Sequence, residues 1–396
     1  MKWKEYSLDE LIHIKHGYAF KGEFFSEEPT DDILLTPGNF AIGGGFKAQK
    51  LKYYNGDFPV DYILEENDVI VTMTDLSKEA DTLGFSAKVP AWNGKRFLHN
   101  QRIGMVKLKT DDFDQNYLYW LMRTFPYQRF VANGATGATV KHTSPTKICQ
   151  YKFTAPENKD RQRKIASILS AYDDLIENNL KRIKLLEEKA FVSYKLIVKS
   201  EKLEEFLIEE VCETLGGGTP ATGDRRFWDE GEILWFSPTD LTKHHSIVLL
   251  ESEKKITDLG LQKSSAKLVP PKTILMTSRA SIGYLGLINK PASTNQGFIN
   301  IVPFNKNHRA YMLFDLKNRK EEIIGNANGS TFLEISKGKF RQMKIKLPKD
   351  EKVLIDFEQE FEVTFNFIEN LLKQNTKLRE ARDILLPKLM NGQIEV

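Results

Sequence analysis

Tyr151–Pro156 reads YKFTAP, and about 192 positions later Lys344–Pro348 reads KIKLP. Each stretch leads directly into a long charged segment. Inside these two segments, Leu175–Asn178 (LIEN) returns as Phe367–Asn370 (FIEN) at the same shift. A period this long does not fit a solenoid, so the sequence predicts an internal duplication and a molecule with pseudo-twofold symmetry.

The repeat continues toward the amino terminus with a small change of shift, as an insertion in a loop would cause. Asn100-Gln101 returns as Asn295-Gln296, and Asp68–Thr74 (DVIVTMT) returns as Lys272–Ser278 (KTILMTS). Gly137–Thr139 returns as Gly329–Thr331. The order of parts is therefore domain, helix, domain, helix. We expect the first domain at 1–156, the first helix at 157–199, the second domain at 200–348 and the second helix at 349–396.

Two long helices are predicted from Lys159 to about Lys199 and from Lys352 to about Met390, because glycine is absent there and Pro387 is the only proline. Both carry apolar residues at alternating spacings of four and three, which is typical of a coiled coil. If the helices pair antiparallel, Asn179 meets Asn375 in one layer. An unpaired buried amide costs about 1–3 kcal/mol, so this layer is expected to fix the helix register. The alternative is that one asparagine faces water.

The two globular domains are predicted to mix strands with short helices, which makes the whole chain α+β. Strand order does not follow from the pattern. The strand candidates are Val69–Met73, Ile103–Leu108, Ile274–Thr277 and Phe298–Val302, and the short helices are Asn116–Met122 and Arg309–Lys317.

The charge balance permits nucleic-acid binding without demanding it. Lysine and arginine number 57 against 54 acidic residues, for a formal charge of +3. Cys149 and Cys212 form no CxxC pair, which fits a reducing compartment. No apolar run approaches the roughly 18 residues that a membrane span needs. We therefore expect a soluble cytoplasmic protein.

No motif for catalysis is found. The sequence lacks the Asn/Asp-Pro-Pro-Tyr/Phe segment of adenine methylation and the G-x-x-x-x-G-K-[ST] phosphate loop. The glycine runs Gly43–Gly45 and Gly216–Gly218 are interpreted as loops. Asp75 and Glu79 are interpreted as ordinary loop acids, because no metal or basic partner accompanies them. We expect no catalytic residues, no bound cofactor and no metal site.

Side chains for DNA contact are sought on loops that leave strands, where arginine reaches guanine and asparagine or glutamine reaches adenine. The alternative for an Asn-Gln pair is that it only closes a turn. The candidates are Asn100, Gln101, Arg102, Lys141, Arg279, Asn295 and Gln296.

Several of these stretches resemble the specificity subunits of type I restriction-modification systems over nearly the whole chain. Thr277–Gly283 (TSRASIG) followed by Asn295–Phe298 (NQGF) is similar to the pattern of the family's second domain. Val71–Leu76 (VTMTDL) followed by Leu98–Gly104 (LHNQRIG) resembles another variant of that domain. Leu385–Gly392 (LLPKLMNG) is similar to the family's closing segment.

The resemblance implies two target recognition domains, each reading half of a bipartite, asymmetric site in double-stranded DNA. It implies that the helices act as a spacer and as the dock for adenine methyltransferase subunits, with ATP-dependent restriction subunits as further partners. Methylation with S-adenosylmethionine and DNA cleavage would then belong to those partners. The entry to the first helix departs from the family's commoner Pro-Pro-x-x-Glu-Gln, because Ala155–Gln162 reads APENKDRQ.

Two other functional classes are weighed against this one. The duplicated domains could form a scaffold that binds protein and no DNA, or an enzyme with an unrecognised site. Salt-dependent binding to duplex DNA separates recognition from scaffolding. Methyl transfer by the chain alone would indicate the enzyme.

Overall fold

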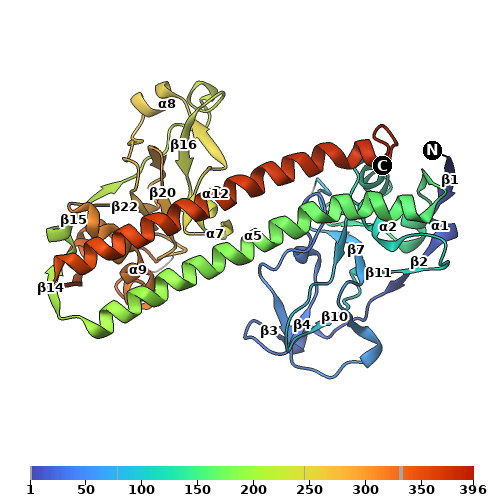
Figure 1. Ribbon diagram of the computed structural model, residues 1–396, viewed down its shortest axis with the longest axis horizontal. Helices are drawn as coiled ribbons and strands as arrows, with labels where there is room; N and C mark the ends of the chain where they lie inside the picture. Colours follow the sequence, from blue (N-terminus) through green and yellow to red (C-terminus); the bar gives the residue numbers. More distant parts are fainter. Residues whose placement is uncertain (1, 78, 245, 330–332) are drawn as a thin grey trace. The chain divides into compact units, whose positions relative to one another are not determined.

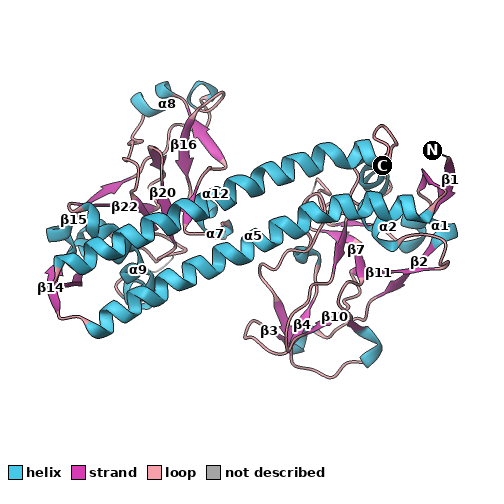
Figure 2. Ribbon diagram, viewed as in Figure 1, coloured by secondary structure: helices cyan, strands magenta, loops and turns pink. Residues whose placement is uncertain are grey.

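The computed structural model describes residues 2–77, 79–244, 246–329 and 333–396. The chain forms two compact units (Figure 1). The first unit combines Met1–Leu175 with Leu378–Val396, and the second is Ile176–Lys377. Both mix strands with helices, as predicted (Figure 2). Ser330 and Thr331, which take part in one of the sequence repeats, lie outside the described residues.

In the first unit, β1 (Trp3–Ser7) pairs antiparallel with β13 (Lys152–Pro156). One sheet has the order β2 (Ile12–His16), β11 (Ile103–Leu108), β7 (Val69–Thr72) and β9 (Ser86–Lys88). A second sheet has the order β3 (Phe25–Ser26), β5 (Lys52–Tyr54), β4 (Asp32–Leu34), β10 (Arg96–Leu98) and β6 (Ile63–Leu64). The helices are α1 (Leu8–Leu11), α2 (Gln115–Leu121), α3 (Phe125–Asn133) and α4 (Pro145–Cys149).

In the second unit, β14 (Leu203–Leu207) pairs antiparallel with β23 (Lys344–Pro348). One sheet has the order β15 (Cys212–Gly216), β22 (Phe298–Pro303), β19 (Ile274–Thr277), β20 (Leu285–Ile288) and β17 (Val248–Leu249). The other has the order β18 (Lys254–Ile256), β16 (Ile233–Phe236) and β21 (Ala292–Thr294). The helices are α6 (Ile208–Val211), α7 (Pro238–Lys243), α8 (Asp258–Gln262), α9 (Arg309–Asn318), α10 (Lys320–Gly325) and α11 (Lys337–Arg341).

The strand pairing repeats from one unit to the other. In the first unit β11 lies between β2 and β7, and in the second β22 lies between β15 and β19, with every pair antiparallel. Each unit also has one parallel pair on its other sheet, β4 with β10 and β16 with β21. The predicted internal duplication is thus confirmed in the topology.

The two long helices are α5 (Lys159–Ser200) and α12 (Glu351–Met390). Both lie within one residue of the helices predicted from Lys159 to about Lys199 and from Lys352 to about Met390. Within the second unit they run antiparallel, because Asn179 contacts Asn375 while Lys189, further along α5, pairs with Glu360, which lies earlier on α12. The apolar stripes predicted from the four-and-three spacing contribute residues to the cores of both units. Ile165, Leu169 and Leu389 belong to the first core, and Ile183, Phe361 and Ile368 to the second.

Candidate nucleic-acid interface

Three segments that are distant in sequence meet at one edge of the first unit. The backbone N–H of Met73, just beyond β7, donates to the carbonyl of Arg102 at 3.0 Å. The N–H of Thr143 donates to the carbonyl of Met73, also at 3.0 Å. We call residues 73–75, 100–102 and 141–143 the first edge. It brings together four of the predicted DNA-contact residues, namely Asn100, Gln101, Arg102 and Lys141.

The second unit builds an edge with the same hydrogen-bond pattern. The N–H of Ser278, just beyond β19, donates to the carbonyl of Gly297 at 2.8 Å, and the N–H of Ile335 donates to the carbonyl of Ser278 at 3.0 Å. We call residues 278–280, 295–297 and 333–335 the second edge. It brings together the other three candidates, Arg279, Asn295 and Gln296.

The two asparagines use their side-chain oxygens inside their own turns. Oδ1 of Asn100 accepts from the N–H of Arg102 at 3.0 Å, and Oδ1 of Asn295 accepts from the N–H of Gly297 at 2.8 Å. Asn100 is buried. These bonds match the turn-closing alternative, because an Asx side chain mimics a backbone turn. His99, next to Asn100, is also buried, and burial lowers its pKa to about 4.

A glycine lies against each Asn-Gln turn. A Cβ added to Gly17 would come within 2.1 Å of the carbonyl oxygen of Asn100, and one on Gly217 within 2.0 Å of that of Asn295. The N–H of Tyr18 donates to the carbonyl of His99, and the N–H of Gly218 donates to the carbonyl of Thr294, both at 2.8 Å. The Gly216–Gly218 run, interpreted from sequence as a loop, therefore ends β15 and packs beneath the second edge.

The remaining candidates present polar atoms at the edges. Gln101 and Arg102 are exposed, and Lys141 is half-buried on β12 (Lys141–His142). Gln296 is exposed, and its Oε1 accepts from Oγ1 of Thr219 at 2.6 Å. Arg279 is exposed and pairs with a residue that sequence reasoning missed.

That missed residue is Glu334, whose Oε1 lies 2.9 Å from Nη2 of Arg279. In the first edge the corresponding facing residues are Thr74 and His142, with Oγ1 and Nδ1 3.1 Å apart. His142 and Glu334 are separated by the repeat shift of 192, so the sequence marks them as equivalent positions. The sequence does not show that they face Thr74 and Arg279, because that depends on which loops pair.

Asp75 binds two later residues of the loop that follows it in the first edge. Its carboxylate accepts from the N–H of Ser77 at 2.7 Å and from the N–H and hydroxyl of Thr82 at 2.7 and 2.6 Å. Burial alone would raise the pKa of this carboxyl group, but the hydrogen bonds outweigh it and the pKa is lowered. The interpretation of Asp75 as an ordinary loop acid therefore becomes more specific, because it is the acceptor that closes the loop.

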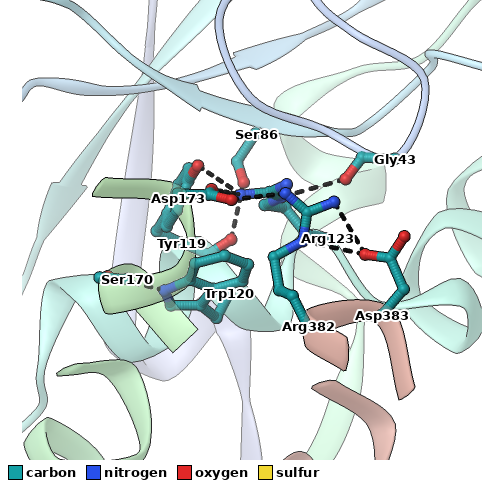
Figure 3. Close-up of polar contacts among 9 residues, drawn as sticks. All are labelled: Gly43, Ser86, Tyr119, Trp120, Arg123, Ser170, Asp173, Arg382 and Asp383. Atoms are coloured by element: carbon teal, nitrogen blue, oxygen red, sulfur yellow. Dashed lines mark hydrogen bonds and ion pairs between the residues drawn. The ribbon is translucent and has the colours of Figure 1, made fainter. Parts of the chain in front are cut away.

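Arg123, two residues after α2, ties the first unit's globular part to α5 directly and to α12 through Asp173 (Figure 3). Its Nη1 donates to Oδ2 of Asp173 on α5 at 2.6 Å and to the hydroxyl of Tyr119 at 2.7 Å, and its Nε donates to the carbonyl of Gly43 at 3.0 Å. Arg382 of α12 bonds the other oxygen of Asp173. One carboxylate thus joins two guanidinium groups from different elements.

The faces around Arg123 are aromatic. Its guanidinium carbon lies 4.3 Å from the ring centre of Trp120, whose indole N–H donates to the hydroxyl of Ser170 on α5 at 3.0 Å (Figure 3). The Arg123 side chain is only 3% exposed, which places a charge in a position where only its partners stabilise it.

The second unit uses different side chains to attach its globular part to the two long helices. Arg309 at the start of α9 pairs with Glu358 and Glu362 of α12. The hydroxyl of Tyr194 on α5 donates to Oδ1 of Asp315 on α9 at 3.0 Å. Each unit therefore fixes its own globular part to both helices through buried polar contacts.

Comparison with known proteins identifies the family. The model of the type I restriction modification DNA specificity domain matches residues 1–188 and again 200–382. The chain belongs to this family. The MjaIX specificity subunit of Methanocaldococcus jannaschii is 32% identical over 47% of this chain and 42% of its own length. The EcoR124I/EcoR124II specificity subunit of Escherichia coli is 25% identical over 67% of this chain and 68% of its own.

The chain thus spans less than half the length of the first of these relatives. Among solved structures, the type I restriction-modification S subunit from M. genitalium matches with a TM-score of 0.58 and 17% identity. That match covers 98% of this chain and 96% of the other. At this identity the match shows a shared fold.

Within the described residues, no helix has both the length and the apolar character that crossing a membrane requires. Over the same residues, no group of three His, Cys, Asp or Glu side chains is arranged to hold a metal ion.

Proposed function

We propose that this chain is the DNA-recognition subunit of a type I restriction-modification complex and reads a bipartite, asymmetric site in double-stranded DNA. Each unit reads one half-site through its edge. The observation that carries the proposal is the repeated three-segment edge, which has the same backbone hydrogen bonds in both units and different exposed polar side chains. One frame with two sets of side chains suits the reading of two different sequences.

The recognition domains of this proposal are residues 1–156 and 200–348, and the spacer helices are residues 157–199 and 349–396. Asn100 and Asn295 shape their turns, because their side-chain oxygens already accept backbone hydrogen bonds. The groups that reach DNA are those whose side chains extend from the edges. They are Gln101, Arg102, Lys141, Arg279 and Gln296.

The partners of this proposal are adenine methyltransferase subunits that dock on the helices, together with ATP-dependent restriction subunits. Support comes from apolar side chains exposed at repeat-related helix positions. Leu175 and Phe367 form one such couple, and Val192 and Ile384 another, with exposed fractions between 42% and 58%. These exposed apolar side chains, at equivalent positions of the two helices, would contribute to a surface that another protein covers. Methyl transfer and cleavage then occur in the partners, and this cytoplasmic chain is non-catalytic and needs no cofactor of its own.

The experiment that tests the proposal is co-production of the full chain with a type I methyltransferase subunit, followed by mapping of methylated adenines. We expect methylation at one bipartite motif, and none from the chain alone. Methyl transfer by the purified chain without a partner would contradict the non-catalytic role.

Independent reading is tested by exchange of one globular unit for that of a relative. One half of the methylated motif should change and the other should stay. A change in both halves would contradict independent reading. Binding to duplex DNA should weaken steeply with salt, whereas a protein scaffold would bind no DNA at any salt concentration.

A further inference from the structure

One position in both edges holds a pair of side chains that face each other across two paired segments. In the first edge Thr74 faces His142 in the β8 (Thr74–Asp75) and β12 ladder, with Oγ1 and Nδ1 3.1 Å apart. In the second edge Arg279 faces Glu334 across an isolated bridge, with Nη2 and Oε1 2.9 Å apart.

The backbone shows that these two pairs are equivalent. Thr74 and Arg279 each lie two residues beyond the end of the corresponding strand, β7 or β19. His142 and Glu334 each lie just before the residue whose N–H bonds back to the loop, Thr143 or Ile335. The same place in the frame therefore carries a hydroxyl with an imidazole in one unit and a guanidinium with a carboxylate in the other.

The ion pair is not needed to hold the second edge together. The N–H of Ala280 donates to the carbonyl of Leu333 at 3.1 Å, and a second backbone bond joins Ile335 to Ser278. The Arg279 and Glu334 side chains are 50% and 41% exposed, and exposed ion pairs stabilise proteins little. Polar groups that add little stability in a rigid frame remain available to a ligand.

The backbone beside Arg279 is strained. Ala280 has φ of 60°, in the left-handed region that residues other than glycine rarely adopt. Such conformations persist where the surrounding structure holds them, and they occur often at functional sites. Here the bonds to Leu333 and Gly297 hold residues 278–280 on both sides, which fixes the direction in which Arg279 leaves the strand.

We propose that the facing pair is the specificity-determining position of each edge, and that Arg279 with Glu334 reads a G·C base pair. This inference rests on the proposed function. Guanine offers N7 and O6 as acceptors in the major groove, and the cytosine paired with it offers an N4 donor. The ion pair uses one of the guanidinium's five N–H donors, so others can reach guanine while Glu334 accepts from cytosine.

Glu334 also disfavours wrong contacts. A carboxylate beside Arg279 repels phosphate. A bidentate guanidinium contact needs two adjacent acceptors, which guanine offers as N7 and O6, whereas adenine has a donor, N6, beside its N7. Thr74 with His142 offers a hydroxyl, which can donate or accept, and an imidazole. The first half-site is therefore read by different chemistry at the equivalent position.

The test is the charge-swapped variant Arg279→Glu with Glu334→Arg, in the full chain complexed with its methyltransferase. A pair that only fastened the loop would tolerate the swap and leave the methylated motif unchanged, which would overturn the proposal. We expect instead that preference for G·C at one position of one half-site falls about tenfold or more. The other half-site should be unaffected.

Two further variants keep the test interpretable. Glu334→Gln preserves the side-chain shape, and should relax the same position even if the swap fails to fold. Lys344→Glu with Glu205→Lys swaps an exposed pair that joins β23 to β14 at 2.6 Å, away from the edge, and should leave the motif unchanged. If the wild-type complex writes no bipartite motif at all, the proposed function itself fails. A wild-type motif that withstands both Arg279–Glu334 variants refutes only the pair.

Discussion

Nδ2 of Asn179 donates to Oδ1 of Asn375 at 2.9 Å, in a layer of α5 and α12 where Asn375 is completely buried. Nδ2 of Asn375 lies 3.4 Å from the carbonyl oxygen of Ile176. Ile183, one turn after Asn179 on α5, and Leu371, one turn before Asn375 on α12, are buried apolar residues. A polar pair enclosed in this way stabilises one helix register, because any slip places an amide against an apolar side chain.

Replacing both asparagines by leucine should keep or raise the melting temperature, since no polar group is left unpaired. Asn375→Leu alone should cost about 1–3 kcal/mol of unfolding free energy, because Asn179 then lacks its acceptor. The double variant should also accept half-sites at more than one spacing, measured by methylation of duplexes with different spacers. An unchanged spacing requirement would show that register is set elsewhere.

Arg123→Met should destabilise the first unit by about 2–3 kcal/mol, measured by denaturant unfolding. The change removes charge-assisted hydrogen bonds to Asp173, Tyr119 and the carbonyl of Gly43. Asp173 keeps Arg382, so the loss should stay below that of a fully orphaned buried charge.

Arg163→Met on α5 provides the control for this prediction. Arg163 is exposed, pairs with Asp160 at 3.0 Å and lies 3.9 Å from Asp114, and such contacts of an exposed side chain contribute up to about 1 kcal/mol. If the two variants lost equal stability, the Arg123 network would contribute no more than a surface pair.

Asp75→Asn should reduce stability by about 1–3 kcal/mol at neutral pH, because the amide replaces a carboxylate that accepts three hydrogen bonds. The folded-state pKa of Asp75 lies below its ordinary value of 3.8. Its contribution is therefore present above pH 4 and is lost as the pH falls through the lowered pKa. The difference in unfolding free energy between wild type and variant should shrink below pH 4.

The exposed Asp61 supplies the comparison, since Asp61→Asn should change stability by less than about 0.5 kcal/mol. A difference for Asp75→Asn that stayed constant with pH would mean that ionisation of Asp75 is irrelevant to the loop.

Gly217→Ala should cost about 1–3 kcal/mol, because the new Cβ would overlap the carbonyl oxygen of Asn295 and displace the second edge. Gly223→Ala is the matched change in the same unit, where a Cβ meets no atom within 4 Å. It should be neutral or slightly stabilising. Equal melting temperatures for the two variants would contradict the tight packing under the Asn-Gln turn.

The long helices and the duplication were predictable because their signals are local or periodic. The four-and-three spacing marks a helix face directly, and the repeated stretches mark equivalent parts of two domains. Strand bounds such as Ile103–Leu108 followed from apolar β-rich runs. The order of strands was not predictable, because β11 pairs with strands that begin more than thirty residues before it, and no local pattern encodes such pairing.

The candidate site also has one part that the sequence predicts and another that only the fold reveals. Loop residues beside strands identified both edges, since polar side chains at strand ends are visible in the sequence. Glu334 and His142 were missed because their roles depend on a facing residue from another segment. Arg123 was missed because arginine is usually a surface residue, and only the fold reveals the aromatic pocket that encloses it.

The two units differ in how they are assembled from the chain, which matters during synthesis. The second is one continuous stretch, whereas the first needs residues 378–396 to finish its core, where Leu386, Leu389 and Met390 join Ile165 and Leu169. A ribosome working from the amino terminus therefore releases a complete second unit while the first still lacks its last helical segment. The apolar side chains of residues 1–175 that this segment covers, such as Ile165 and Leu169, stay open until residues 378–396 have been made.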